Sequence, residues 1–484
     1  PNVDREETII GVGSDGRLKM PLGREYRYDF STREKEYEAG VFPLNHVFDS
    51  TQWMMGWWTY WNQDQDKMNL FLRFQNEVLS AFHGYKLPLI LLKKETPKEA
   101  VCLVFEKVNT GGVPLNAFEL VTATFAADGF QLREDWCDTR HRTGRYYDII
   151  HSQNGHLLKD LGPTEFLQAV TLLHSYTRNR EEEAAGNTPP PVSCTRPSLL
   201  RLPLEGYKRH SDPVTEGFKD VPRFLYSEKI FSRRDIPYDT QLVPLAAILG
   251  RLGKRWLDHD VRSKLRRWFW CGVLGELYGS SVESRFAKDL PQVLNWIEGG
   301  PEPETVQVAH FYAERLYGLK TRRSAAYKGL HALIMRFEAR DFVHGEKIDE
   351  ARYCDESIEI HHIFPRSWCQ KEQKDERFLE SILNKTAISG RANRTIGGNA
   401  PSKYIPSLEK RFDFDQKQMD QVLQSHLINP EALRNDDFET MIQDRRKRLL
   451  QMISQAMGKD VVSGTDAEGG EEIVYNEEEV YMFT

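Results

Sequence analysis

Two adjacent histidines, His361 and His362, are the residues of this chain best suited to chemistry. An imidazole titrates near neutral pH, so one ring can take a proton from water while a second holds a divalent metal ion. Asn384 and Asn393 follow, with eight residues between them. We interpret the segment 358–404 as the site of a metal-assisted hydrolysis. The alternative is a hydrogen-bonded pair of histidines beside two asparagines in turns.

The residues around these side chains predict the elements that position them. Polar and apolar residues alternate over 358–361, which predicts a half-buried strand that carries the histidines to its end. Pro365 ends that strand and fixes the turn after it. We predict a second short strand over 386–389, and a helix that begins near Arg391 and returns Asn393 towards the histidines.

This order of strand, strand and helix resembles the ββα-metal fold of HNH nucleases, and more narrowly the HNH domain of GmrSD-type modification-dependent restriction enzymes. That family typically shows an (E/H)HI-x-P element, two asparagines at this spacing and a trailing N-R-x-I-G-x-x-x-P-S-x-Y. Here the first element is HHIFP over 361–365, and the trailing one runs from Asn393 to Tyr404. The resemblance implies hydrolysis of DNA phosphodiester bonds to a 5′ phosphate and a 3′ hydroxyl.

The resemblance also implies roles for individual residues. His362 would be the general base that activates water, and Asn384 would brace the loop that aims it. His361 and Asn393 would bind a divalent metal ion. Mg²⁺ or Mn²⁺ is expected for this chemistry, and a His/Asn ligand set also accepts Zn²⁺ or Ni²⁺. Arg394 would contact the scissile phosphate.

A second region, FEKVNTGGVPLNAFEL over 105–120, combines a glycine turn with the start of a helix. Free backbone amides in such a turn can hold an anion, although an ordinary connection between two helices has the same composition. The run resembles an element of GmrS-type domains, which are ParB/sulfiredoxin-like and bind and hydrolyse nucleotides. The resemblance implies nucleotide contacts by Asn109, Thr110, Gly111 and Gly112.

Two helix-capping patterns flank that turn: Thr96-Pro97 with Glu99, and Asn116 with Glu119. The D-G-Q-Q-R motif that the family places upstream is absent from this chain. We therefore expect only part of a GmrS-type domain here, and a bound nucleoside triphosphate only in a full-length parent. The chain begins without methionine, which we interpret as a fragment or a processed form.

At 484 residues the chain has room for about two to four domains. Its net charge of −7 is unusual for a DNA-binding protein, but residues 459–484 carry eight acidic side chains and one lysine, so the rest of the chain is neutral. A neutral body can still present a basic groove. We predict a disordered, solvated acidic tail, with competition against DNA for that groove as the alternative.

The six cysteines are scattered and include no C-x-x-C pair, which favours a reducing cytoplasm and argues against a structural zinc site. Cys354 and Cys369 flank the histidines and could bind zinc, although buried thiols are the more common outcome. No apolar run is long enough to span a membrane, and no secretory signal is visible.

Helices account for most of the remaining chain. Residues 131–340 read as a helical connector with a polar loop over 180–197, followed by a helix over 242–257. The apolar face of the next helix is formed by Val261, Leu265, Trp268 and Phe269. A final amphipathic helix is predicted over 437–457, with a basic run at 445–448 that adds to a DNA surface.

A tryptophan-rich cluster lies near the amino-terminal end of the chain. Its aromatic residues are Trp53, Trp57, Trp58, Tyr60 and Trp61. Their near-helical spacing predicts packing in a core or at a domain interface. The alternative is a platform on which a flipped base stacks.

Together these patterns predict an α+β multidomain chain. We expect a partial GmrS-type domain over 1–130, a helical connector over 131–340, an HNH domain with its C-terminal helix over 341–458, and an acidic tail over 459–484. The predicted function is that of a cytoplasmic, metal-dependent endonuclease that acts on modified phage DNA in anti-phage defence and is gated by a nucleotide-binding domain. A homodimer would permit double-strand cleavage, since one HNH site cuts one strand. The alternatives are a non-specific DNA nickase and a catalytically silent DNA-binding module.

Overall fold

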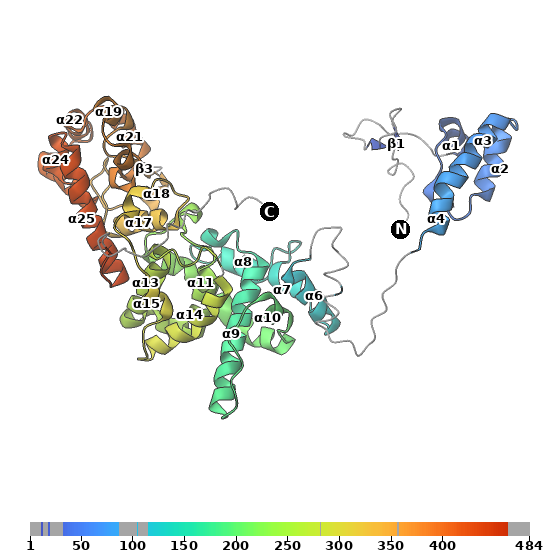
Figure 1. Cartoon of the computed structure of the whole chain (residues 1–484), viewed down its shortest axis with the longest axis horizontal. Helices are drawn as coiled ribbons and strands as arrows, with labels where there is room; N and C mark the ends of the chain where they lie inside the picture. The colour runs from blue at the N-terminus through green and yellow to red at the C-terminus, as the bar shows by residue number, and fades with distance from the viewer. Residues whose placement is uncertain are drawn as a thin grey trace. The chain divides into compact units, whose positions relative to one another are not determined.

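The computed structural model describes residues 32–86, 115–280, 282–355 and 358–462, with residue 104 and two strand segments at 11–12 and 18–19. The chain divides into two compact units, Pro1–Glu95 and Thr96–Thr484 (Figure 1). Both are mainly helical and each holds one two-stranded sheet, which agrees with the predicted α+β class in outline. None of the helices in the described ranges is long and apolar enough to cross a membrane.

Helices form the larger part of the first unit. β1 (Gly11–Val12) and β2 (Leu18–Lys19) form a short antiparallel pair. The helical part contains α1 (Arg33–Ala39), α2 (Thr51–Tyr60), α3 (Gln65–Phe74), the π-helical segment η2 (Gln75–Leu79) and α4 (Ser80–Gly84).

Aromatic side chains make the core of this first unit. Trp53 and Trp57 are buried and stack on each other with ring centroids 5.3 Å apart, and Tyr37 and Phe71 pack against them. The indole of Trp53 donates a hydrogen bond to Glu36 at 3.0 Å. The interpretation of the tryptophan cluster as core packing is therefore confirmed for Trp53 and Trp57, whereas Trp58 and Trp61 are half-buried and Tyr60 is exposed.

The second unit begins with a bundle of helices that surrounds one core. Its longer helices are α6 (Ala117–Ala127), α9 (Pro163–Ala184), α11 (Leu204–Ser227), α12 (Leu242–Leu252), α13 (His259–Leu274), α14 (Val282–Ile297) and α17 (Ala325–Arg336). The shorter ones are α7 (Leu132–Cys137), α8 (Arg145–Ile150), α10 (Arg196–Leu200), α15 (Glu304–Val308), α16 (Arg315–Gly318) and α18 (Glu350–Asp355).

Local sequence signals explain several of these helices. α6 starts with the predicted capping box, in which the Asn116 and Glu119 side chains each accept a backbone hydrogen bond from the other residue. α11 and α12 approach so closely that a Cβ on Gly217 would lie 2.0 Å from the carbonyl oxygen of Ala246. The predicted apolar face of α13 is buried, as its spacing requires.

Two predicted boundaries in this bundle are wrong. The loop expected from residue 180 begins only after Ala184, because the glutamates continue α9 and pair with arginines, including Glu181 with Arg209 at 2.7 Å. The helix expected over 242–257 ends at Leu252. Gly253, at φ +54, breaks it, and the chain continues as the 3₁₀ turn η6 (Gly253–Leu257).

The last third of the chain contains the second sheet and its covering helices. The elements in order are β3 (Glu359–His362), α19 (Arg366–Lys371), α20 (Glu376–Leu379), β4 (Lys385–Ile388), α21 (Gly390–Ile396), α22 (Pro401–Phe412), α23 (Gln416–Ser425), α24 (Pro430–Arg434) and α25 (Phe438–Met457). The strand before the histidines, the turn at Pro365, the second strand and the helix after it are confirmed to within about two residues. One continuous core cluster joins these elements to the helical bundle.

α25 agrees with the predicted final helix in extent but not in the placement of its basic run. Arg445 was expected on a surface that meets DNA, yet its side chain is fully buried. It lies three residues after Ile442 and four before Leu449, so the helical period turns it inward with them. The helix begins after Asp437, whose carboxylate accepts the backbone N–H of Thr440 at 3.1 Å.

Candidate active site

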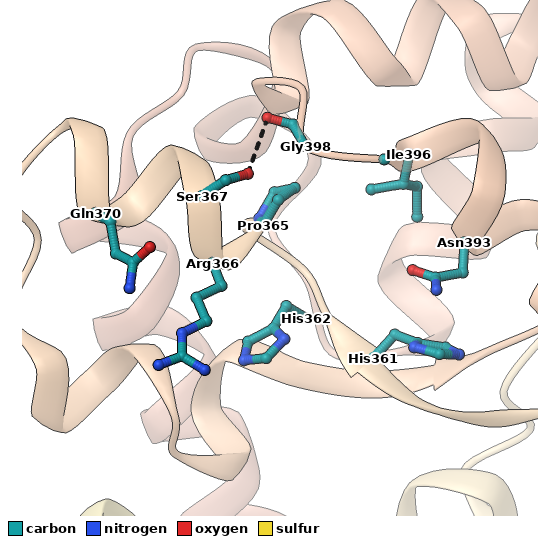
Figure 2. Close-up of a pocket in the computed structure, with 10 residues that line it drawn as sticks. His361, His362, Pro365, Arg366, Ser367, Gln370, Asn393, Ile396 and Gly398 are labelled. Atoms are coloured by element: carbon teal, nitrogen blue, oxygen red, sulfur yellow. Dashed lines mark hydrogen bonds between the residues drawn. The ribbon is translucent and has the colours of Figure 1, made fainter.

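The β3–β4 hairpin and α21 bring three of the predicted site residues to one pocket. β3 and β4 are antiparallel, with His361 opposite Thr386 and His362 opposite Lys385. The hydroxyl of Ser389 caps α21, whose first turn carries Asn393 back over the strand end. Figure 2 shows His361 and Asn393 on the same side of the pocket, with His362 turned towards Arg366.

The pocket has a volume of about 460 Å³ and lies open to solvent. Its wall is completed by Pro365, Arg366, Ser367, Gln370, Ile396, Gly397 and Gly398. Gly398 approaches α19 so closely that a Cβ would lie 2.6 Å from the Ser367 hydroxyl, which donates a 3.5 Å hydrogen bond to the Gly398 carbonyl. The glycine therefore lets the loop after α21 close this side of the pocket.

Asn384 lies beneath the pocket and holds the loop that follows His362. Its buried Oδ1 accepts the backbone N–H of Phe364 at 2.8 Å, and its Nδ2 donates to the carbonyls of Phe364 at 3.0 Å and Leu379 at 3.2 Å. Its own carbonyl accepts the backbone N–H of Ile363 at 2.8 Å. These are the contacts that the predicted bracing role requires.

Tyr404 secures the same loop from α22. Its fully buried hydroxyl donates to the carbonyl of Ile363 at 2.9 Å. Burial raises the pKa of this phenol, so it stays a neutral donor. The sequence prediction assigned Tyr404 no role beyond its place in the trailing motif. Its place in that motif was the signal that could have indicated a role at the site.

A carboxylate lies beside the candidate base. Nε2 of His362 is 3.4 Å from Oε2 of Glu380, which also accepts a 3.0 Å hydrogen bond from the ammonium group of Lys385. Arg366 lies 3.7 Å from the other oxygen of Glu380. Sequence reasoning missed both Glu380 and Arg366, which lie in a stretch rich in charged residues where neither stands out.

The surroundings favour a neutral imidazole at His362. Burial lowers its pKa, the charge of Lys385 lowers it further, and Glu380 only partly opposes these effects. At Glu380 burial acts to raise the pKa, but the hydrogen bond and charge of Lys385 outweigh it, so the pKa is lowered. A neutral ring beside an ionised carboxylate is the arrangement in which an imidazole can accept a proton.

The pocket residues fit a divalent cation that takes only part of its ligands from the protein. His361 supplies an imidazole and Asn393 an amide oxygen, both on the pocket wall. Over the described ranges no three His, Cys, Asp or Glu side chains group closely enough to hold a metal by themselves. Such a site suits an ion that completes its shell with water and phosphate oxygens.

The alternative zinc site is not supported at Cys369. Its thiol is buried beneath the pocket, lies 3.6 Å from the carbonyl oxygen of Phe364, and has a pKa raised to about 12 by burial. Cys369 is also absent from the wall of the pocket that holds the histidines. Cys354, the other cysteine of that alternative, has a side chain outside the described residues.

The remaining predicted site residues do not join the pocket. Arg394 is exposed on α21 and is absent from the pocket wall, where Arg366 supplies the guanidinium instead. The predicted nucleotide contacts at 109–112 and the capping pattern at 96–99 lie outside the described residues, as does the acidic tail beyond residue 462.

Comparison with known proteins adds one distant relative. No protein-family profile matches the chain. It is 25% identical over 485 residues to an uncharacterized protein, MJ0686, from Methanocaldococcus jannaschii, an alignment that covers 93% of this chain and 77% of the relative. The similarity extends over nearly the whole chain, but the relative carries no assigned activity that could be transferred.

Proposed function

We propose that this chain is a metal-dependent DNA endonuclease of the HNH type, with His362 as its general base. The observation that carries the proposal is the convergence of His361, His362 and Asn393 on one pocket, built by a two-stranded hairpin and the helix that follows it. A polar pair of histidines with a merely structural role would not need an open pocket, a clamped loop or a neutral imidazole. Asn384 supports the proposal by fixing the loop.

The reaction follows from the side chains in the pocket. His362 takes a proton from a water molecule as the water oxygen attacks the phosphorus. The bond to the 3′ oxygen breaks, and this leaving oxygen takes up a proton from solvent. A divalent ion held by His361 and Asn393 would offset the charge on the phosphate and on the leaving oxygen. Arg366, which is exposed and lines the pocket, would contact the phosphate. The products are a 5′ phosphate and a 3′ hydroxyl.

The biological setting rests on the resemblance to GmrSD-type enzymes. We propose that the substrate is DNA with modified bases, as in phage genomes, and that the protein acts in the cytoplasm in anti-phage defence. Mg²⁺ or Mn²⁺ would be the metal, and a nucleotide-binding amino-terminal domain would control the nuclease. A homodimer would supply the second site for double-strand cleavage.

The test is cleavage of supercoiled plasmid and of phage DNA with modified bases, each with Mg²⁺, Mn²⁺ or EDTA. We expect metal-dependent cleavage of the modified DNA. His362→Ala should bind DNA unchanged but cut at least about 100-fold more slowly, since a general base contributes that much or more. His259→Ala, an exposed histidine on α13, is the matched control and should cut normally.

The other outcomes are equally informative. Equal cleavage of both DNAs would favour a non-specific nickase. Binding without cleavage under every metal, unchanged by His362→Ala, would overturn the nuclease proposal in favour of a DNA-binding module.

A further inference from the structure

A charged residue beside the candidate base, Glu380, has a position that the proposed reaction does not explain. Glu380 lies between the candidate base and two cations, 3.4 Å from Nε2 of His362, 3.0 Å from the Lys385 ammonium and 3.7 Å from Arg366. If it served only as a counter-ion for Lys385, it would not need to face the imidazole.

The backbone holds Glu380 in place from both sides. It ends α20, where the carbonyl of Leu379 accepts the Asn384 amide at 3.2 Å. Two residues later, the N–H of Ile382 donates to the carbonyl of Leu319 at 2.8 Å. The Lys385 ammonium is itself anchored by the carbonyl of Lys320 at 3.0 Å. Both ends of the Glu380–Lys385 pair are therefore fixed before any substrate binds.

The carboxylate determines which nitrogen of His362 carries the proton. Nε2 is buried and forms no hydrogen bond of good geometry with any residue that the structure describes, and Glu380 is the acceptor beside it. A lone pair on Nε2 would face a carboxylate oxygen and be repelled, whereas an N–H in that position is attracted. The proton therefore belongs on Nε2, and the lone pair on Nδ1.

The two ring nitrogens of His362 face different surroundings. Figure 2 shows one ring nitrogen turned towards the Arg366 side and the other towards the side where His361 lies. Both histidines line the same pocket. With Nε2 beside Glu380, Nδ1 is the nitrogen left to face a water molecule and a phosphate there.

We propose that Glu380 is a positioning residue for His362, which fixes the proton on Nε2 and presents Nδ1 to the pocket as the basic nitrogen. The inference rests on the proposed function, because it assigns the orientation of the general base. Lys385 keeps the carboxylate ionised and in place, and the more exposed Arg366 can leave it for the phosphate.

The first test needs neither DNA nor metal. The chain is labelled with ¹⁵N-histidine and kept in EDTA, and His362 is assigned among the 14 histidines by comparison with His362→Gln. Long-range proton–nitrogen correlations should show one tautomer, with Nε2 protonated and Nδ1 bare. Glu380→Met, which removes charge and acceptor, should move both nitrogens towards the averaged shifts of a ring that exchanges between tautomers. A wild-type ring protonated on Nδ1 would overturn the proposal.

The second test is kinetic. Glu380→Gln keeps an acceptor but loses the charge, and we expect kcat to fall about tenfold; for Glu380→Met we expect about 100-fold, the range typical of residues that orient a ligand or base. KM should change less than about threefold in both, since Glu380 does not touch the substrate. Glu376→Gln, which changes an exposed glutamate at the start of α20, is the control and should behave as wild type.

The two tests separate the inference from the proposed function. If the wild type is active and Glu380→Gln, Glu380→Met and Glu376→Gln all keep kcat within about twofold of its value, the positioning role is wrong although the protein is a nuclease. If the wild type cuts no DNA, the proposed function fails, and the nitrogen shifts still decide whether Glu380 orients the ring.

Discussion

The Asn384 clamp leads to a quantitative prediction for the isosteric change Asn384→Asp. In the native protein Nδ2 donates to two carbonyl oxygens, those of Phe364 and Leu379. An aspartate places an oxygen where that nitrogen lies, and an ionised oxygen would face both carbonyls at about hydrogen-bond distance. The folded variant therefore needs a protonated carboxyl, which can still donate to one of them.

The cost follows from the proton that folding must bind. An unfolded aspartate has a pKa of about 3.9, so holding it protonated costs about 1.4 kcal/mol for every pH unit above that value. The penalty is about 4 kcal/mol at pH 7 and about 1.5 kcal/mol at pH 5. The pKa of this new carboxyl is higher in the folded than in the unfolded state, so the substitution destabilises the protein more as the pH rises.

Urea unfolding of wild type and variant at pH 5, 6 and 7, followed by circular dichroism, measures this difference. Taking the difference at each pH removes effects that both proteins share. Asn435→Asp, an exposed asparagine in the same unit, is the control and should change stability by less than about 0.5 kcal/mol. A penalty for Asn384→Asp below about 1 kcal/mol that does not vary with pH would refute the clamp.

Three further predictions follow from the same geometry. Arg445→Met leaves the carbonyls of two buried residues unpaired and should destabilise the chain by about 2–4 kcal/mol in thermal or urea unfolding, while the exposed Lys447→Met should be nearly neutral. As the pH is lowered, kcat/KM should begin to fall only below pH 6.5, because the lowered pKa of His362 keeps the imidazole neutral at higher pH. A fall that begins above pH 7 would contradict this. Arg366→Ala should raise KM for DNA by about three- to tenfold, and Arg394→Ala should raise it by less. A larger effect of Arg394→Ala would indicate that Arg394, and not Arg366, contacts the phosphate.

Features set by neighbouring residues were predictable from the sequence. Three signals each involve residues within four positions of one another: the alternation over 358–361, the turn at Pro365 and the capping box of Asn116 and Glu119. The strand, the turn and the helix that they predict form where they were expected. The tryptophan core was predictable for the same reason, since its residues recur on one face of a helix. Local spacing therefore located the hairpin, its helix and the pocket between them.

Features set by distant residues were not predictable in the same way. Glu380 lies 18 positions after His362 in the sequence, and only the path of α19 and α20 brings the two together. Arg366 lines the pocket where Arg394 was expected, since it directly follows Pro365, whereas Arg394 is exposed on α21 and absent from the pocket wall. Arg445 differs from these, since its spacing from Ile442 and Leu449 already indicated the buried face of α25.

The candidate site depends on more of the chain than its motif contains. Arg445 from α25 donates to the carbonyl of Lys385 at 2.8 Å, and the Lys385 side chain holds both the Lys320 carbonyl and Glu380. Strand β4 is thus fixed by Arg445 of α25 and by the Lys320 carbonyl of the bundle. Lys385 of the same strand in turn holds the Glu380 carboxylate beside His362. Because these contacts are buried and mostly charged, removing one partner would leave another without compensation. The base is therefore oriented by the folded second unit as a whole, and a fragment that ends after the motif would lack the Arg445 contact.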